Sequence, residues 1–449
     1  MQPHISPLLP SFSSLELAEP LLAAVRRLGY EQPTPVQQKA IPLALAYKDL
    51  LVSAETGSGK TAAFLLPTLH HLLTLPSKKF GTRALILTPT RELAQQVFKQ
   101  CQQLLELTEL QVGLITGGDD FRLQQNMLRR NTACVVATPG RLLELMEQET
   151  PDFSHLEVLV LDEADRMLDM GFSEDVLKIA NSCNGQRQTL LFSATLTHFG
   201  VIKMADKLLA NHETVALNTL HDGHRNIQQQ IIVADDNGHK QKLLAWLLLN
   251  ETYDKALIFT NSRVQADALQ GPLRGQKLRV GVLHGEMEQK DRNRIMALYR
   301  DGVINVLVAT DLAARGLDIK GINLVINFDV PRNGINYIHR IGRTGRVDEL
   351  GLTVALVKST EWNLMSGIER FLKQKFIHRT IKELEGKYKG PKKIKASGKA
   401  AGIKKKVEPK KSAVEKVKVR HRDQKNIGKR RAPSTVVPKG EGVPNPDNG

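Results

Sequence analysis

The chain has 449 residues and a formal net charge of +16, a length typical of two or three domains. The charge is uneven: residues 381–449 hold 21 Lys or Arg and 7 Asp or Glu, a net of +14, which leaves +2 for the first 380 residues. A nearly neutral body with a basic C-terminal segment excludes a uniformly basic structural protein. It favours a globular protein with an electrostatic arm, most simply for nucleic acid.

Disulfide scaffolds, secreted proteins and membrane-spanning proteins do not fit the sequence. The three cysteines (Cys101, Cys134 and Cys183) have no CxxC spacing, so a zinc site is disfavoured and inert thiols in a reducing compartment are expected. No apolar run approaches the roughly 18 residues that span a bilayer. The first twenty residues lack the basic stretch and apolar core of a secretory signal. We therefore expect a soluble, cytoplasmic protein.

Short, continuous runs of apolar and often β-branched residues recur along the chain, each followed by a turn and a segment of helical length. Such runs are typical of strands buried on both faces of a parallel sheet. The predicted strands are Leu50–Ser53, Ala84–Thr88, Val135–Thr138, Val158–Leu161 and Thr189–Ser193 in the first half, and Ala256–Thr260, Val280–His284, Val306–Thr310, Leu324–Phe328 and Thr353–Val357 in the second. Two such series predict two α/β domains, which bind ligands outside the carboxyl ends of their strands.

A polar stretch without periodicity, Asn218–Asn226, separates the two series and suits a linker. The predicted organisation is an N-terminal domain at 1–218, a linker at 219–226, a C-terminal domain at 227–380 and a basic tail at 381–449. From about Gly386 the apolar periodicity disappears and lysine runs begin. Such a segment buries too little apolar surface to offset its ordering entropy, so we expect a disordered tail.

A glycine-rich loop follows the first strand, with the sequence Ala54-Glu-Thr-Gly-Ser-Gly-Lys60-Thr61. The general phosphate-loop pattern begins with Gly, where this chain has Ala54. The loop lies between a strand and a helix, so its backbone N–H groups are expected to face a polyphosphate. These residues are Thr56, Gly57, Ser58 and Gly59. Lys60 is predicted to reach the β- and γ-phosphates, and the Thr61 hydroxyl to bind Mg²⁺.

An acidic cluster, Asp162-Glu163-Ala164-Asp165, follows the strand Val158–Leu161. A carboxylate at this strand end, facing the phosphate loop, is placed to hold Mg²⁺, and we assign that role to Asp162. Glu163 is placed to orient or deprotonate an attacking water molecule. The cluster and the loop together predict an ATP-hydrolysing site.

The second half has no phosphate loop and instead carries His339-Arg340-Ile-Gly-Arg343-Thr-Gly-Arg346. Arginines three residues apart, with glycines between them, are expected to project guanidinium groups into a cleft, where a planar fork contacts phosphate. An arginine finger of this kind raises a phosphoryl-transfer rate by about 10³–10⁵. Arg343 and Arg346 would then complete a site divided between the domains, so hydrolysis is expected to require domain closure.

These motifs resemble the DEAD-box RNA helicases of superfamily 2, over residues 12–375. The resemblance implies two tandem RecA-like domains with parallel sheets, ATP and Mg²⁺ as cofactors, and RNA-stimulated ATP hydrolysis coupled to local unwinding of short RNA duplexes. It implies that Gln37 reads the adenine edge, that Tyr30 stacks on the adenine ring, and that Gly316 and Asp318 contact the ribose. It also implies that Asp165, Ser193 and Thr195 couple hydrolysis to strand separation, with His339 in the network that links them to the γ-phosphate.

The resemblance also implies an RNA site along the strand edge that binds ATP. Its expected residues are Pro89, Thr90, Arg91, Gly118, Thr138, Gly140, Arg141, Arg292 and Thr310. Side chains and backbone amides of this kind bind phosphate and sugar without reading bases, so we expect RNA binding with little sequence preference.

The tail is where a particular RNA could be selected. The block Arg420–Arg431 resembles one near the C-terminus of a bacterial DEAD-box helicase that acts in assembly of the large ribosomal subunit, which favours an rRNA or pre-ribosomal substrate. The alternative is a non-specific polybasic RNA anchor.

Three other functions remain open: an ATP-regulated RNA clamp or annealing scaffold, a DEAD-box helicase of mRNA decay or translation, and a superfamily 2 DNA helicase. The intact set of Lys60, Glu163, Arg343 and Arg346 favours the enzyme over the clamp, and the family motifs disfavour the DNA helicase. No coiled-coil pattern is present, so we expect a monomer.

Overall fold

The computed structural model describes residues 11–54, 57–75, 81–130, 132–148, 151–196, 198–217, 226–314, 319, 321–345, 350–391, 395, 398 and 400. The described residues form two seven-stranded sheets, and every strand pair in both sheets is parallel. The C-terminal unit, Gly402–Gly449, lies outside this description. In the part of the chain that is described, no helix has the length and apolar character needed to cross a membrane.

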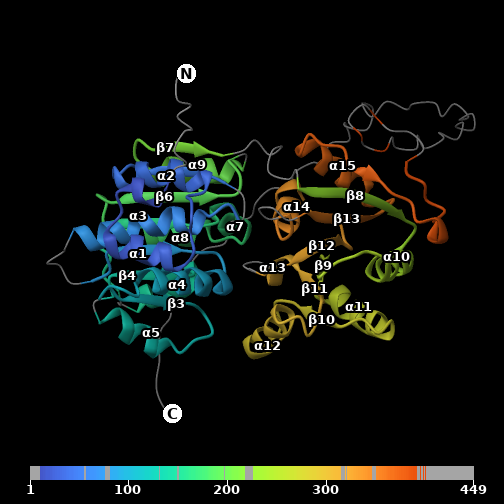
Figure 1. The fold of residues 1–449 in the computed structure, drawn as a ribbon, viewed down its shortest axis with the longest axis horizontal. Coiled ribbons are helices and arrows are strands. Elements are labelled where there is room, and N and C mark those ends of the chain that lie inside the picture. The colour runs from blue at the N-terminus through green and yellow to red at the C-terminus, as the bar shows by residue number, and fades with distance from the viewer. Residues whose placement is uncertain are drawn as a thin grey trace, which may run out of the picture. The chain divides into compact units, whose positions relative to one another are not determined.

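The first sheet has the strand order β3-β4-β2-β5-β6-β1-β7 (Figure 1). Its strands are β1 (Leu50–Ser53), β2 (Ala84–Leu87), β3 (Val112–Ile115), β4 (Cys134–Ala137), β5 (Val158–Leu161), β6 (Gln188–Ser193) and β7 (Glu213–Ala216). The five inner strands, β4, β2, β5, β6 and β1, are buried at every position, as continuous apolar runs require.

Helices cover both faces of this sheet. The 3₁₀ turn η1 (Phe12–Leu15) and helices α1 (Glu19–Arg27), α2 (Pro35–Leu45), α3 (Lys60–Thr74) and α4 (Arg91–Leu105) pack on one face. The other face carries α5 (Phe121–Leu128), α6 (Pro139–Glu147), α7 (Ala164–Asp169), α8 (Ser173–Ser182) and α9 (Phe199–Leu208). Alternate strand residues enter the two cores, because successive side chains point to opposite faces of a strand.

The second sheet has the order β10-β11-β9-β12-β13-β8-β14. Its strands are β8 (Ile227–Ala234), β9 (Lys255–Thr260), β10 (Val280–Leu283), β11 (Val306–Thr310), β12 (Ile322–Asn327), β13 (Gly351–Lys358) and β14 (Ile377–His378). Helices α10 (Asn237–Asn250) and α11 (Arg263–Gly275) cover one face. The opposite face carries α12 (Gln289–Arg300), α13 (Asp311–Ala314), α14 (Gly334–Ile341) and α15 (Trp362–Phe371).

The prediction of two parallel α/β sheets is confirmed. The ten predicted runs coincide with ten strands to within two residues at each end, and β3, β7, β8 and β14 are the strands outside those runs. On either side of the expected linker, β7 ends at Ala216 and β8 begins at Ile227, and residues 218–225 lie outside the described residues.

Folded structure in the second half continues past residue 380, where the tail was expected to begin. Ile381 is 4% exposed and belongs to the core, and η2 (Lys382–Leu384) follows it. The Asp235 carboxylate accepts hydrogen bonds from the backbone N–H groups of Lys387 (2.9 Å) and Tyr388 (2.6 Å). These few contacts order a lysine-rich stretch whose composition alone is typical of disorder.

Candidate ATP site and nucleic-acid groove

The phosphate loop connects β1 to α3, as the sequence predicts. Gly57 and Gly59 have φ values of 83° and 90°, in the left-handed region that glycine adopts without strain. Lys60 opens α3, is 7% exposed, and donates from Nζ to the Ala54 carbonyl at 2.7 Å. Thr61 is the next residue of the helix and is partly exposed. Thr56 lies outside the described residues.

The Gln37 side chain fastens α2 to the phosphate loop. Its Nε2 donates to the Gly59 carbonyl at 3.0 Å, and its Oε1 accepts from the Thr34 backbone N–H at 2.9 Å. A Cβ on Gly59 would lie 2.6 Å from Gln37 Nε2, so this approach requires glycine. Tyr30 is partly buried, and its hydroxyl accepts from Gln100 Nε2 at 2.8 Å. Gln37 is therefore hydrogen-bonded to the phosphate loop, and Tyr30 is hydrogen-bonded to α4.

The acidic cluster begins where β5 ends. Glu163 is the N-cap of α7 and has φ 52° and ψ 49°, a left-handed conformation that is uncommon for a residue with a side chain. Its Oε2 accepts from Arg166 Nη1 at 2.8 Å. Burial raises the pKa of Glu163, but the positive charges of Arg166, Arg343, Lys60 and His339 outweigh burial and hold that pKa below its ordinary value. Glu163 is therefore ionised at neutral pH.

Asp162 has the surroundings of a cation ligand. It is 3% exposed, and its Oδ1 has no hydrogen-bond partner among the described residues. Burial and the neighbouring Glu163 charge raise its pKa, which indicates that its negative charge lacks full compensation. Carboxylate and hydroxyl oxygens suit a hard divalent cation, so Asp162 and the Thr61 hydroxyl fit Mg²⁺.

Asp165 and His339 form a buried pair between the first and second halves. His339 Nε2 lies 3.2 Å from Asp165 Oδ2, and these residues are 9% and 0% exposed. Although burial acts to raise it, the pKa of Asp165 is held well below its ordinary range by His339, Lys60 and Arg166. Burial and Arg166 lower the pKa of His339. Asp165 is therefore ionised at neutral pH.

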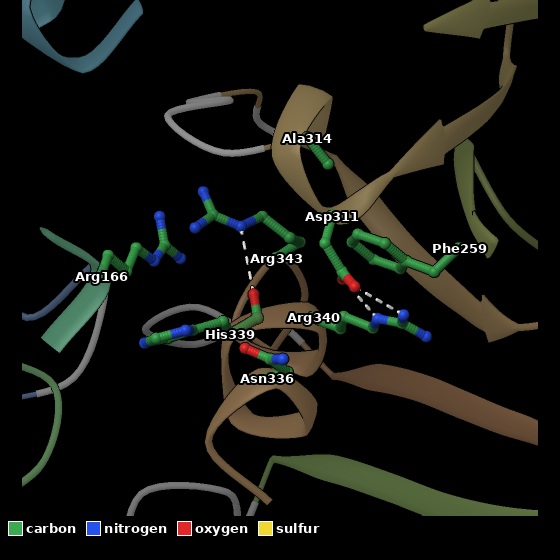
Figure 2. A pocket seen from close by; sticks show the side chains of 8 residues that line it. All are labelled: Arg166, Phe259, Asp311, Ala314, Asn336, His339, Arg340 and Arg343. Carbon is green, nitrogen blue, oxygen red and sulfur yellow. Dashed lines mark hydrogen bonds and ion pairs between the residues drawn. The ribbon is translucent and has the colours of Figure 1, made fainter. Parts of the chain in front are cut away.

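The arginine motif does not project every guanidinium group into the cleft. Arg343 and His339 line a small pocket together with Arg166 of α7, and Figure 2 shows both side chains extending toward Arg166. Arg340 turns the other way, is 1% exposed, and bonds both oxygens of Asp311 at 2.6 and 2.8 Å. Arg340 also lines the pocket, but its guanidinium is bound by Asp311, and it does not share a helical face with Arg343 because α14 ends at Ile341. Arg346 lies outside the described residues.

Ser193 and Thr195 bond to one another at the end of β6. Ser193 Oγ donates to the Thr195 carbonyl at 2.8 Å and lies 3.2 Å from the Thr195 backbone N–H. The Ser193 carbonyl accepts from the Ala54 backbone N–H at 3.1 Å, so this turn adjoins the phosphate loop. Of the three residues predicted to couple hydrolysis to strand separation, Asp165 is the one whose contact with His339 is described above.

A second cavity, with about 1080 Å³ of empty space, is an open groove lined by both halves. Seven of the nine predicted RNA-binding residues line it, whereas Gly118 and Thr310 are not among its lining residues. The lining residues are Pro89, Thr90, Arg91, Glu92, Gly117, Thr138, Gly140, Arg141, Glu144, Met170, Phe172, Gly285, Met287, Gln289, Arg292 and Leu312.

The basic groups in this groove are held by specific neighbours. Arg91 lies across two glycines: a Cβ on Gly117 or Gly118 would come within 2.7 or 2.6 Å of its guanidinium nitrogens. Arg141 forms an ion pair with Glu144 at 3.0 Å. Arg292 donates from Nε to Glu92 Oε1 at 3.1 Å, which joins α12 to α4. The groove therefore presents positioned cations suited to a phosphate backbone.

Several residues at these two sites were not predicted from the sequence. Arg166 directly follows the acidic cluster, and its position three residues after Glu163 on a helix is the signal that could have indicated their ion pair. Met170, Phe172, Met287 and Leu312 line the groove as apolar residues, which no charge or glycine pattern marks. Gly316 and Asp318 lie outside the described residues.

Comparison with known proteins identifies the family. The model of the DEAD/DEAH box helicase domain matches residues 34–201, and that of the helicase conserved C-terminal domain matches residues 239–348. The ATP-dependent RNA helicase SrmB of Haemophilus influenzae is 43% identical over 440 residues, which cover 95% of this chain and 99% of that protein. SrmB of Escherichia coli is also 43% identical, over 97% of this chain and 98% of the relative.

Solved structures give the same result. Dbp5 of Saccharomyces cerevisiae bound to RNA and ADP BeF3 matches with a TM-score of 0.75 and 30% identity, over 82% of this chain and 95% of that chain. Mss116p bound to ssRNA and AMP-PNP matches with a TM-score of 0.73 and 29% identity, over 83% and 79%. The two sheets are thus tandem RecA-like domains, and the chain belongs to the DEAD-box family of ATP-dependent RNA helicases.

Proposed function

We propose that this helicase remodels ribosomal RNA during assembly of the large ribosomal subunit, by opening short duplexes each time ATP draws its two RecA-like domains together. The observation that carries the closure mechanism is the pocket of Figure 2, which is lined by Arg166 of the first domain and by His339 and Arg343 of the second. A site whose cations come from both domains is complete only when the domains meet, so ATP can control their relative position.

The proposed catalytic roles follow from this geometry. Lys60 and the loop amides bind the phosphates, and Arg343 with Arg346 stabilises the charge of the transferring phosphoryl group. Glu163, ionised at neutral pH, orients or deprotonates the attacking water. Gln37 and Tyr30 hold adenine, while Gly316 and Asp318 contact the ribose.

We assign the metal site to Asp162 and the Thr61 hydroxyl, in part through water. Mg²⁺ supplies charge neutralisation and Lewis acidity at the phosphates when it is bound. The orphaned, buried Asp162 oxygen supports this assignment.

The proposed link between hydrolysis and RNA runs through Asp165 and His339. Their 3.2 Å contact joins the helix after the acidic cluster to α14, and the Ser193–Thr195 turn lies beside the phosphate loop. RNA lies in the groove that Arg91, Arg141 and Arg292 line, where it contacts both domains. Bending of one strand on closure would separate a short duplex, and hydrolysis would release it.

The rRNA assignment rests on the tail. The alignment with SrmB covers 95% of this chain and so extends beyond Ala401 into the basic unit, which contains Arg420–Arg431. We propose that this tail anchors the enzyme on rRNA or pre-ribosomal particles, and that the enzyme is a cytoplasmic monomer.

Trapping the enzyme on its RNA tests this function. Glu163→Gln is expected to bind ATP and RNA with strongly slowed but measurable turnover, so RNA crosslinked to it in cells and sequenced should be enriched in large-subunit rRNA. Lys60→Ala, which loses ATP binding, is the matched control. Enrichment of mRNA instead of rRNA would favour a role in mRNA decay or translation. Normal subunit assembly in cells that contain only Glu163→Gln would favour the RNA clamp.

A further inference from the structure

We propose that Arg166 is a positioning residue for ATP hydrolysis: it keeps the Glu163 carboxylate bound to α7 and away from Arg343. This inference rests on the function proposed above, because it assigns Arg166 a role through Glu163. Nothing in the motif spacing required an arginine at this position, which immediately follows the acidic cluster.

The ion pair closes the first turn of α7. Arg166 is 1% exposed, and its Nη1 donates to Glu163 Oε2 at 2.8 Å across three residues. Glu163 precedes the helix in a left-handed conformation, which is strained for a residue with a side chain and persists only where the surroundings determine it. The pair is one such determinant, and because it is local to α7 it does not depend on the position of the second domain.

The surroundings show why a fixed Glu163 matters. The cations that act on it are Arg166 and Lys60 from the first domain and Arg343 and His339 from the second, and Asp162 is the neighbouring anion. Figure 2 shows Arg343 and His339 facing Arg166 across the pocket. Without Arg166, the Glu163 carboxylate would be free to turn toward Arg343, whose positive charge already acts on it from across the pocket. A Glu163–Arg343 pair would occupy both the proposed base and the proposed phosphate-binding arginine.

Direct phosphate binding by Arg166 is the competing interpretation. It is disfavoured because Nη1 is already engaged by Glu163 and the side chain is almost completely buried. The two interpretations differ in the kinetic constant that should change. A positioning role lowers kcat, whereas a phosphate contact formed in the ground state raises KM for ATP.

The test compares Arg166→Met, Arg166→Lys, Glu163→Gln and the double variant Arg166→Met/Glu163→Gln in the full chain. Steady-state ATPase is measured at saturating RNA, together with ATP and RNA affinities. Arg166→Met is expected to lower kcat by about 10-fold or more, with KM for ATP and RNA affinity within about twofold, and Arg166→Lys to recover part of the loss. In the Glu163→Gln background, Arg166→Met should have no further effect, because it acts through Glu163.

Three results would overturn the proposal: unchanged kcat in Arg166→Met, a raised KM for ATP, or a further loss in the Glu163→Gln background. The double variant is also a control for misfolding. Its neutral Gln removes the buried carboxylate charge that Arg166→Met alone would leave unpaired. Wild-type turnover in Glu163→Gln alone would instead contradict the proposed role of Glu163. The failure of the inference and the failure of the proposed function are thus distinguishable.

Discussion

At the scale of single residues, Arg340 and Arg343 of one motif have different roles. Arg340 bonds both oxygens of Asp311 and the side-chain oxygens of Asn327 and Asn261, and its guanidinium lies 5.1 Å from the Phe259 ring centroid. It ties together the ends of β9, β11 and β12. Arg343 lies past the end of α14, in the pocket of Figure 2.

This difference predicts opposite consequences for the same substitution. Arg340→Met should lower the free energy of unfolding by about 3–5 kcal/mol, because it leaves Asp311 as an uncompensated, partly buried charge. Arg343→Met should leave stability nearly unchanged and lower kcat by about 10²–10³. Denaturant unfolding and ATPase rates of the two variants measure this contrast. Equal stability losses would show that Arg343 is also structural.

The motif residues show how far sequence can predict a site. The phosphate loop and acidic cluster were predicted because each directly follows a buried strand, whose end fixes their position. The role of Arg340 could not be predicted, because it depends on Asp311, Asn327 and Asn261, which are distant in sequence. The three-residue spacing of the arginines is uninformative where a helix ends between them, at Ile341.

At the scale of elements, strands made of one continuous apolar run were predictable, whereas edge strands and the glutamine-rich β8 were not. β5 is a continuous apolar run, whereas β7 is buried only at Val215 and β3 alternates between buried and partly exposed residues. Both are edge strands of the first sheet. β8 begins with Ile227 and three consecutive glutamines, so only its second half, Ile231–Ala234, is an apolar run, and β14 has only two residues.

The short segment after β14 predicts a difference between two truncations. Deletion of residues 381–449 removes Ile381 from the core and leaves Asp235 without its two backbone partners, so the melting temperature of the second domain should fall by several degrees. Deletion of residues 402–449 removes none of the contacts described for this segment. Its melting temperature should equal that of the full chain. Equal melting temperatures for both truncations would contradict a structural role for 381–391.

At the scale of the whole molecule, we expect the tail to contribute to RNA affinity and the two domains to hydrolyse ATP. The basic unit at 402–449 carries much of the positive charge but none of the catalytic residues. Deleting it should leave the maximal RNA-stimulated ATPase rate largely intact, weaken RNA affinity, and make the dependence of log affinity on log salt shallower, because fewer counterions are released. RNA titrations at several salt concentrations check this. An unchanged slope would show that the tail does not engage phosphates.

The most direct measurement is the steady-state ATPase rate of the full chain with no nucleic acid, with rRNA, with an unrelated RNA of equal length and with single-stranded DNA, at two salt concentrations. We expect strong stimulation by both RNAs, half-maximal at a lower concentration for rRNA, and little stimulation by DNA. Equal stimulation by DNA and RNA, or tight RNA binding without turnover, would contradict an RNA-dependent ATPase that acts on rRNA.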